Sequence, residues 1–496
     1  MEKQNFINIK SEKFKNAILC VTPLVFTILF HLLKITDEAN VRFFMQLSLA
    51  LVTAYGGYLA YRGKLDAAKA VTLILIAGVI IRTGYTIYTD AFTRAHDMDG
   101  NMPDGVGHFS YVYQVFNGHL PTTNTWQFYH PPLFHIISAA FIRVSMLITG
   151  SDTFNDYTYM AQTVSCIASC AALITFSKIM DELNIKKHIQ IIPVVLTAFY
   201  PAQILAAAYM NNDALVFMFM LLAIYFTLKW HKEQKMAYII GIAITIGCGM
   251  MTKISCALVA FIAGPVMIYH LIKRIKSKDS AEIKDIIIQL AVFAVIVFPL
   301  GMWYAIRNYI LFDQPLNFVL DVGSGFPVWT GDKPFITRWV NISLAKLFTQ
   351  PYGEDVNVWA DLIKTGVHGM YEWEGESGVL AWGLDYIHAA LMAVTLVAVA
   401  FTAAKNTAEY RYQRYSVLAV WAIVGISYIS FNASHPAITT SDFRYVFLGQ
   451  VAAAVLVGYF TNYCFKNRDK RLYNIFCGIN ITVIMLFCVM SIIKFA

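Results

Sequence analysis

Long apolar runs follow one another along most of the chain and are separated by short polar segments. A run of 18 or more apolar residues is long enough to cross the hydrocarbon core of a membrane as a helix. Such runs predict about 13 membrane-spanning helices, and the run at 236–252 is the shortest of them. The predicted spans are 17–35, 42–61, 70–88, 157–180, 188–208, 213–231, 236–252, 254–272, 284–304, 381–404, 415–432, 444–464 and 472–494. The pattern therefore predicts an all-α polytopic membrane protein.

Composition excludes several other classes of protein. Hydrophobic residues make up 58% of the chain and charged residues only 14%, whereas soluble domains carry roughly 25% charged residues. The chain contains neither a G-x-x-x-x-G-K-[ST] motif nor a G-x-G-x-x-G motif after a strand, so nothing indicates that it uses ATP, GTP or a dinucleotide. The 8 cysteines lie in or beside apolar runs and show no disulfide framework or metal-site spacing. The first apolar run has no small-residue cleavage site, so we expect it to remain as an anchor.

Charge predicts the orientation of the protein. Short loops rich in lysine and arginine stay on the cytoplasmic side of a membrane. If the spans alternate from a cytoplasmic N-terminus, most of the 38 lysines and arginines lie inside, and most of the 31 acidic residues lie outside or at outer helix ends. The net charge of +7 then records the inner face of a membrane and does not indicate a nucleic-acid partner. We expect an integral protein of a bacterial cell membrane with no nucleic acid among its partners.

Two outer segments are much longer than the other loops. In the first, Thr89–Tyr157, apolar residues at helical spacing predict a helix over Gly105–Asn117, and Pro131-Pro132 can open another. We expect both helices to lie in the outer membrane interface. The second segment, Asn308–Leu380, combines several tryptophans with many acids and predicts an outer subdomain at the membrane surface.

These features divide the chain into four parts. An N-terminal pair of transmembrane helices precedes a transmembrane core that includes the first outer loop, residues 89–156. The outer subdomain and a C-terminal group of transmembrane helices follow. The predicted parts are 1–69, 70–307, 308–380 and 381–496.

Polar residues that are costly at membrane depth gather at the predicted outer face. Because a charged group in a membrane costs about 2.5–3.5 kcal/mol on insertion scales, such residues tend to mark function. Each also has an ordinary explanation, such as a headgroup anchor for an arginine, a helix cap for an aspartate or a simple hydrogen bond for a histidine. Their convergence on one face favours a functional site. The candidates are His96, Asp97, Asp104, His108, His130, Asp213, Lys253, Arg307 and Arg444.

An ordered series of segments carries a family resemblance. It consists of an acidic loop after a span, GHFSYVYQVFNGHLP, WQFYHPPLFH, NNDAL at the start of a span, a TK break, and WYAIRNYILF before a large outer loop. From about residue 70 onward, this series resembles the GT-C fold of lipid-dependent glycosyltransferases. The similar branch contains the protein O-mannosyltransferases and the lipid A aminoarabinose transferases. Spans 17–35 and 42–61 look like an addition to the family core.

The resemblance implies transfer of a sugar from a polyprenyl-phosphate carrier to a hydroxyl acceptor at the outer face. In this family an aspartate of the first outer loop acts as general base, which is the usual role of a carboxylate opposite a hydroxyl. Asp97, in HDMDG, resembles the His-Asp pair of Gram-positive relatives. Asp104 precedes the helix where other members carry an Asp-Glu pair, but this chain has Gly107-His108 there. Both aspartates remain candidates for the base, with a slight preference for Asp97.

The leaving lipid phosphate needs preorganised cations, and Lys253, Arg307 and Arg444 are the candidates. By the same resemblance, Asp213 orients the acceptor or a donor cation. His96, His108 and His130 are further candidates for substrate binding. A divalent metal is compatible with this chemistry but not required by it.

The expected partners are a polyprenyl-phosphate sugar, membrane lipids and a glycan, lipid or protein that bears a hydroxyl group. The carrier is undecaprenyl phosphate if the source is bacterial, and an apolar groove between spans would hold its tail. A transporter or lipid-glycan flippase is the alternative, but transporters place their charges near the membrane midplane. A non-catalytic membrane scaffold is a third interpretation, and it does not require the charged residues.

Overall fold

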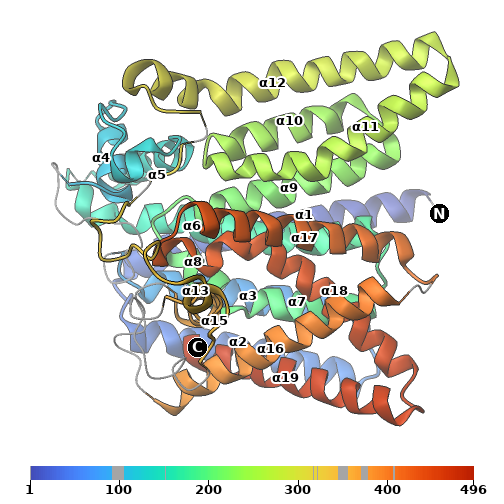
Figure 1. Cartoon of the computed structure of the whole chain (residues 1–496). Helices are drawn as coiled ribbons and strands as arrows, with labels where there is room; N and C mark the ends of the chain where they lie inside the picture. Colours follow the sequence, from blue (N-terminus) through green and yellow to red (C-terminus); the bar gives the residue numbers. More distant parts are fainter. Residues whose placement is uncertain are drawn as a thin grey trace.

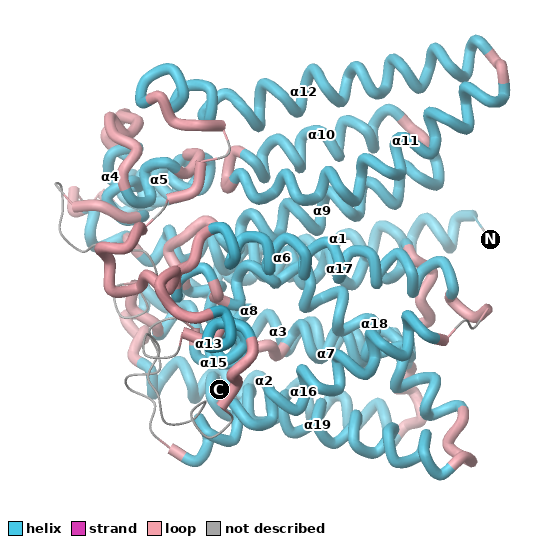
Figure 2. The backbone as a smooth tube through the Cα atoms, in the orientation of Figure 1, coloured by secondary structure: helices cyan, strands magenta, loops and turns pink. Residues whose placement is uncertain are grey.

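The computed structural model describes residues 2–91, 105–150, 152–316, 318–320, 322–343, 356–369, 378–405 and 408–496. Over these residues the fold is all-α, and the one β feature recorded for them is an isolated bridge between Trp329 and Ala437. Figures 1 and 2 show long helices running side by side, with shorter helices and loops gathered at one end of the bundle.

The helices of the bundle account for most of the chain. They are α1 (Glu2–Leu33), α2 (Glu38–Tyr61), α3 (Ala67–Tyr88), α6 (Tyr159–Glu182), α7 (Lys187–Ala198), α8 (Pro201–Ala208), α9 (Asp213–Glu233), α10 (Met236–Met250), α11 (Ala260–Ser277), α12 (Ser280–Phe312), α16 (Val379–Ala404), α17 (Arg411–Ser434), α18 (Phe447–Lys466) and α19 (Arg471–Phe495). The other described helices are α4 (His108–Phe116), α5 (Leu133–Thr149), α13 (Phe335–Trp339) and α15 (Val358–His368), together with 3-10 turns that include η3 (Ile254–Val259) and η5 (Phe443–Val446).

Among the described residues, 11 helices are long and apolar enough to cross a membrane, or up to 12 if the bent pair α7–α8 is one span. The predicted count of 13 is not confirmed. The difference lies at the predicted span 236–252, where α10 has 15 residues. At about 1.5 Å per residue such a helix falls short of the roughly 30 Å of hydrocarbon in a bilayer.

The predicted helices of the first outer segment are confirmed. The helix expected over Gly105–Asn117 is α4, and Gly118 follows it with a φ of 81°, the left-handed conformation that favours glycine at a helix end. The helix expected after Pro131-Pro132 is α5, which begins at Leu133. Figure 1 places α4 and α5 together at one end of the bundle.

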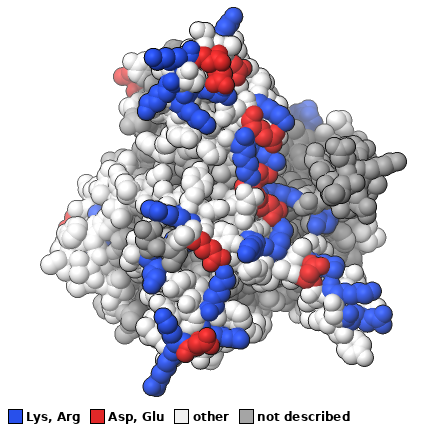
Figure 3. Space-filling view, turned by 90° about the vertical axis from the view of Figure 1, so that its right-hand side faces the viewer, with Lys and Arg blue, Asp and Glu red and all other residues white. Residues whose placement is uncertain are grey.

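The two ends of the bundle differ in chemistry. We call the end that carries α4, α5 and α15 the loop end, and the opposite end, where the N-terminus lies, the basic end (Figure 1). Figure 3 looks onto the basic end, where lysine and arginine side chains are spread over the surface with fewer acidic ones between them. This distribution is the one expected of a cytoplasmic face.

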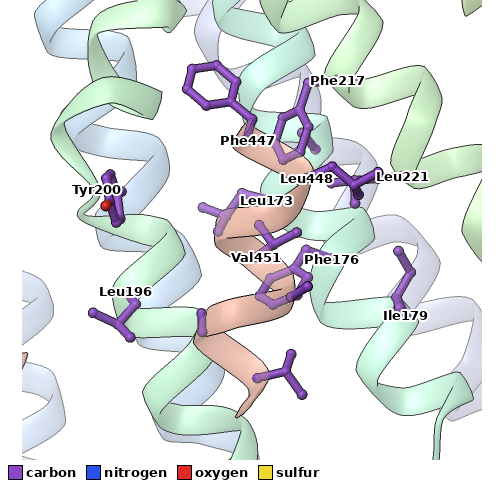
Figure 4. Close-up of a cluster of buried hydrophobic side chains, with 14 of the residues drawn as sticks. Leu173, Phe176, Ile179, Leu196, Tyr200, Phe217, Leu221, Phe447, Leu448 and Val451 are labelled. Atoms are coloured by element: carbon purple, nitrogen blue, oxygen red, sulfur yellow. The ribbon is translucent and has the colours of Figure 1, made fainter. Parts of the chain in front are cut away.

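Helix α18 lies in the centre of the packing. Its side chains Phe447, Leu448 and Val451 are buried against apolar residues of the neighbouring helices, such as Phe217 of α9 and Phe176 of α6 (Figure 4). By contrast, α12 and α2 expose many large apolar side chains. Exposed apolar surface on long helices suits contact with lipid.

Helices α7 and α8 form a single path with a bend of 52°, and Pro201 opens the second half. The bend leaves backbone carbonyl groups without helical partners. Arg82 of α3 is fully buried, and its guanidinium donates to the carbonyls of Ala198 at 2.6 Å and Thr197 at 2.9 Å and to Oγ of Ser169 at 3.0 Å. One buried arginine thus supplies hydrogen-bond donors to carbonyl groups at the bend between α7 and α8.

Candidate active site at the loop end

Three of the predicted site residues meet in one ion cluster. Nζ of Lys253 is 2.5 Å from Oδ1 of Asp213, and Nη1 of Arg444 is 3.3 Å from Oδ2 of the same carboxylate. The three side chains are between 7% and 11% exposed. The ring of Tyr445 lies 5.3 Å from the Lys253 ammonium and 5.0 Å from the Arg444 guanidinium. Two cations are therefore held next to each other by one shared carboxylate.

Helix ends and a break in the chain place these groups. Asp213 is the first residue of α9, and Arg444 lies in η5 directly before α18. Lys253 is in an extended conformation between α10 and η3. The side-chain amide of Asn212 donates to the carbonyl of Thr252 at 3.1 Å, so the start of α9 is tied to the break that carries Lys253.

The second outer segment contributes a wall of this site. A small cavity beside the ion cluster is lined by Ala202 and Ala206 of α8, by Tyr209, Asp213, Asp442, Arg444 and Phe447, and by Thr365 and Gly369 at the end of α15. Gly369 has a φ of 70°, and a Cβ at this position would clash with the hydroxyl of Tyr209. The cavity therefore depends on glycine at 369.

Buried polar contacts hold helix α15 against the bundle. Ser441 donates to Asp361 at 3.0 Å, and the backbone N–H of Phe443 donates to Oγ1 of Thr365 at 2.9 Å. Lys494 of α19 lies 3.2 Å from Nδ1 of His368. All of α15 except Trp359 is buried, because its polar residues find partners inside the bundle. The outer subdomain expected over 308–380 stays a prediction.

A stack of histidines forms a second cluster. The rings of His108 and His130 lie parallel with centroids 5.8 Å apart, and those of His108 and His135 with centroids 5.2 Å apart. Nδ1 of His108 is 2.9 Å from Nε2 of His135. The ring of Tyr111 stacks on His135 at 3.7 Å. Burial lowers the pKa of His135 well below its usual range, and the two neighbouring histidines add to this effect.

Helix α12 supports the histidine cluster from the other side. The hydroxyl of Tyr111 donates to that of Tyr304 at 2.9 Å, and Tyr304 donates to the carbonyl of Phe128 at 2.9 Å. One turn further on, Arg307 donates to the carbonyl of Pro121 at 2.7 Å and to the side chain of Asn308 at 2.9 Å. Arg307 therefore braces the first outer segment instead of joining the ion cluster.

Met251 joins the two clusters. Its carbonyl accepts a hydrogen bond of 3.0 Å from the backbone N–H of Leu133, the first residue of α5, and its sulfur contacts the indole N–H of Trp303. Met251 lies two residues before Lys253. The histidines and the ion cluster thus belong to neighbouring parts of one region.

The structure shows where six of the nine predicted site residues lie. The structure brings Asp213, Lys253 and Arg444 together and stacks His108 on His130. Arg307 lies apart from the ion cluster, on the carbonyl of Pro121. The other three predicted residues, His96, Asp97 and Asp104, lie outside the described residues, so the choice of base stays a prediction.

Sequence reasoning missed His135 and the end of α15. The segment WQFYHPPLFH contributed to the family resemblance, but its last histidine, His135, was not among the candidate residues. For α15 a usable signal existed, since Asp361, Lys364 and His368 recur at a spacing of three and four residues and share a helix face.

An apolar cavity of about 380 Å³ lies between the helices, toward the basic end. It is lined from five helices, and among its walls are Phe176 of α6, Leu221 of α9, Phe261 of α11, Val420 of α17 and Val455 of α18. Its volume falls in the range of about 300–1,000 Å³ that is typical of ligand sites, and almost all of its lining is hydrocarbon.

Residues 147–315 match the family model described as dolichyl-phosphate-mannose-protein mannosyltransferase. The match covers about a third of the 496 residues and includes Asp213, Lys253 and Arg307. It supports, for this part of the chain, the predicted resemblance to the protein O-mannosyltransferase branch of the GT-C fold. No curated protein sequence matches the chain.

Two solved structures of ArnT from Cupriavidus metallidurans are similar to the chain. The apo structure shares 13% sequence identity with a TM-score of 0.35, and covers 80% of this chain and 79% of ArnT. The structure bound to undecaprenyl phosphate shares 14% identity with a TM-score of 0.34, and covers 78% of this chain and 77% of ArnT. A likeness of this size does not bear on individual residues.

Proposed function

We propose that the protein is a membrane glycosyltransferase that moves a sugar from a polyprenyl-phosphate carrier to a hydroxyl acceptor at the loop end, which faces the outside of the cell membrane. The observation that carries this proposal is the ion cluster of Asp213, Lys253 and Arg444. It places two cations side by side at the end of the bundle, within and beside the part of the chain that matches the mannosyltransferase family.

The ion cluster suits a phosphate that gains charge. When the bond between the sugar and the carrier breaks, negative charge develops on the phosphate oxygens. Preorganised cations in a site shielded from water stabilise such charge without reorganising. Lys253 and Arg444 supply the cations, and Asp213 holds them in place. Arg307 acts by bracing the first outer segment or by contacting the phosphate once the carrier is bound.

The acceptor hydroxyl requires a base. Asp97 and Asp104 are the proposed candidates, with Asp97 preferred, because a carboxylate within hydrogen-bond reach can take the proton of a hydroxyl. His96, His108 and His130 are proposed to contact the sugar or the phosphate. A divalent metal would add charge stabilisation without changing these assignments.

The apolar cavity supports a lipid carrier. Its lining from α6, α9, α11, α17 and α18 is almost entirely hydrocarbon, which suits an isoprenoid chain and no polar ligand. The ArnT structure with undecaprenyl phosphate is described as a complex with this class of lipid, and we propose a polyprenyl phosphate of the same class as the carrier here.

Sugar release tests the proposal. Purified protein in nanodiscs is offered a panel of radiolabelled polyprenyl-phosphate sugars with hydroxyl-bearing acceptors, beside the variants Asp97→Asn, Asp104→Asn and Lys253→Ala. We expect turnover in the wild type, its loss in one of the two aspartate variants, and weaker donor binding in Lys253→Ala. Asp152→Asn and Lys466→Ala are matched controls, because Asp152 is exposed and Lys466 forms a half-exposed pair with Glu409.

Two results would count against the proposal. The first is a folded wild-type protein that neither binds nor cleaves any polyprenyl-phosphate sugar. The second is movement of an intact lipid-linked sugar across the bilayer without cleavage, which would favour the flippase.

A further inference from the structure

The contact between His108 and His135 restricts where their protons lie. A neutral imidazole carries one N–H and one bare nitrogen. Because Nδ1 of His108 faces Nε2 of His135 at 2.9 Å, one of these nitrogens must donate and the other must accept. Two arrangements remain for a pair of neutral rings.

The surroundings of His135 distinguish the two arrangements. His135 is fully buried, and its Nδ1 has no hydrogen-bond partner among the described residues. If His108 donated, the proton of His135 would sit on this Nδ1 as a buried donor without an acceptor, which is costly. If His135 donates through Nε2, its Nδ1 is a bare nitrogen.

The position of His135 in α5 favours the bare nitrogen as well. His135 is the third residue of the helix, where backbone N–H groups without helical partners give the helix end a partial positive charge. Helical side chains tilt toward this end. A lone pair is stabilised there, whereas an N–H or a charged imidazolium is destabilised.

We propose that His135 is a positioning residue that donates from Nε2 to Nδ1 of His108 and thereby fixes neutral His108 as the tautomer with its proton on Nε2. His108 then offers the site a hydrogen-bond donor, on the side of its ring that faces away from His135. Within the described part of the chain, the groups that face this pair are His130, Tyr111 and Tyr304, with Arg307 one turn beyond Tyr304.

The tautomer sets the class of group that His108 can bind. A donor at Nε2 requires an acceptor opposite it, such as a phosphate oxygen, a carboxylate or a sugar hydroxyl oxygen. A metal ion at Nε2 would require the opposite tautomer and the buried, unpartnered N–H on His135. This use of His108 in sugar transfer rests on the proposed function, but the tautomer itself does not.

Nuclear magnetic resonance of the full chain in nanodiscs tests the tautomer directly. The nitrogen atoms of its 12 histidines are labelled isotopically, and the His108 signals are identified by their loss in His108→Gln. We expect Nδ1 of His108 as a bare, accepting nitrogen and Nε2 as a protonated one at neutral pH. A proton on Nδ1 of His108, or a charged His108, would overturn the proposal. This measurement needs no enzymatic activity, so it is independent of the proposed function.

Two variants at 135 test the consequence. His135→Phe keeps a ring against Tyr111 but removes the donor, while His135→Asn retains an N–H. In His135→Phe we expect His108 to populate both neutral tautomers. We also expect kcat to fall about tenfold, the size of effect expected from one lost hydrogen bond. KM for the donor should change less than kcat. Recovery of both the tautomer and kcat in His135→Asn supports the proposal. A His135→Phe protein that is folded and retains the wild-type His108 signals would refute it.

Discussion

Asp213 holds two buried cations, so its replacement by asparagine should be among the most damaging single changes at the loop end. The carboxylate lies 2.5 Å from Nζ of Lys253 and 3.3 Å from Nη1 of Arg444. At an effective dielectric constant of about 20, these separations correspond to gross attractions of about 7 and about 5 kcal/mol. Desolvation of the charges offsets most of this.

The net effect follows from the charge left behind. Asp213→Asn leaves Lys253 and Arg444 next to each other without their shared counterion, and losing one partner of a buried pair costs about 3–5 kcal/mol. The double variant Asp213→Asn with Lys253→Met removes one charge of each sign and so restores the original balance. We therefore expect the double variant to be more stable than the sum of its two single variants predicts, by about 2 kcal/mol, a coupling within the range seen for contacting residues.

Thermal unfolding in nanodiscs measures this coupling. The four proteins of the cycle are compared at one heating rate, because membrane proteins often unfold irreversibly and the midpoint then depends on the rate. The control cycle is Lys466→Met with Glu409→Gln, a pair at 2.7 Å whose side chains are 44% and 49% exposed, where we expect a coupling below about 1 kcal/mol. Additive effects at Asp213 and Lys253 would show that the carboxylate does not hold the cations.

Three further predictions concern other parts of the structure. Arg82→Lys should lower the unfolding midpoint, with a loss of about 1–3 kcal/mol, because an ammonium cannot reproduce the planar set of donors of a guanidinium and leaves a buried carbonyl without a donor. Gly369→Ala should reduce sugar transfer more than it reduces stability, because the added methyl group enters the cavity beside the ion cluster. In the activity assay, Gly118→Ala is the control for backbone strain, because Gly118 also has a positive φ but its added methyl group meets nothing within 4 Å. The lowered pKa of His135 means that the unfolded chain binds more protons than the folded one below its unfolded pKa of about 6.5. Stability should therefore fall as the pH drops below about 6.5, and His135→Phe should reduce this slope in a series of unfolding curves.

The sequence by itself determined the class of fold. The apolar runs and the basic loops are properties of each segment alone, because every span must satisfy its own backbone and bury its own side chains in lipid. The helices of the first outer segment could be predicted for a similar reason, since Gly118 and Pro131-Pro132 set local backbone conformation. The count of spans was less secure at α10, where a short apolar helix differs little in pattern from a full span.

Sequence also placed Asp213, Lys253 and Arg444 at the same end of the bundle. It could not show that Lys253 and Arg444 share the carboxylate of Asp213. Nor could it show that Arg307, predicted at the same end, contacts the carbonyl of Pro121 instead. Which helix ends meet depends on which helices are neighbours in the bundle, and the hydropathy of each segment does not determine its neighbours.

Only the tertiary structure decided what His135 and α15 do. Along the chain, His135 is one polar residue in an apolar helix, and its role arises from the ring of His108 against it. The polar face of α15 looks like a solvated surface until Ser441 and Lys494 are brought to it from segments far away in the chain. A buried polar group needs a partner, and for these residues the partner is supplied by the fold rather than by the neighbouring sequence.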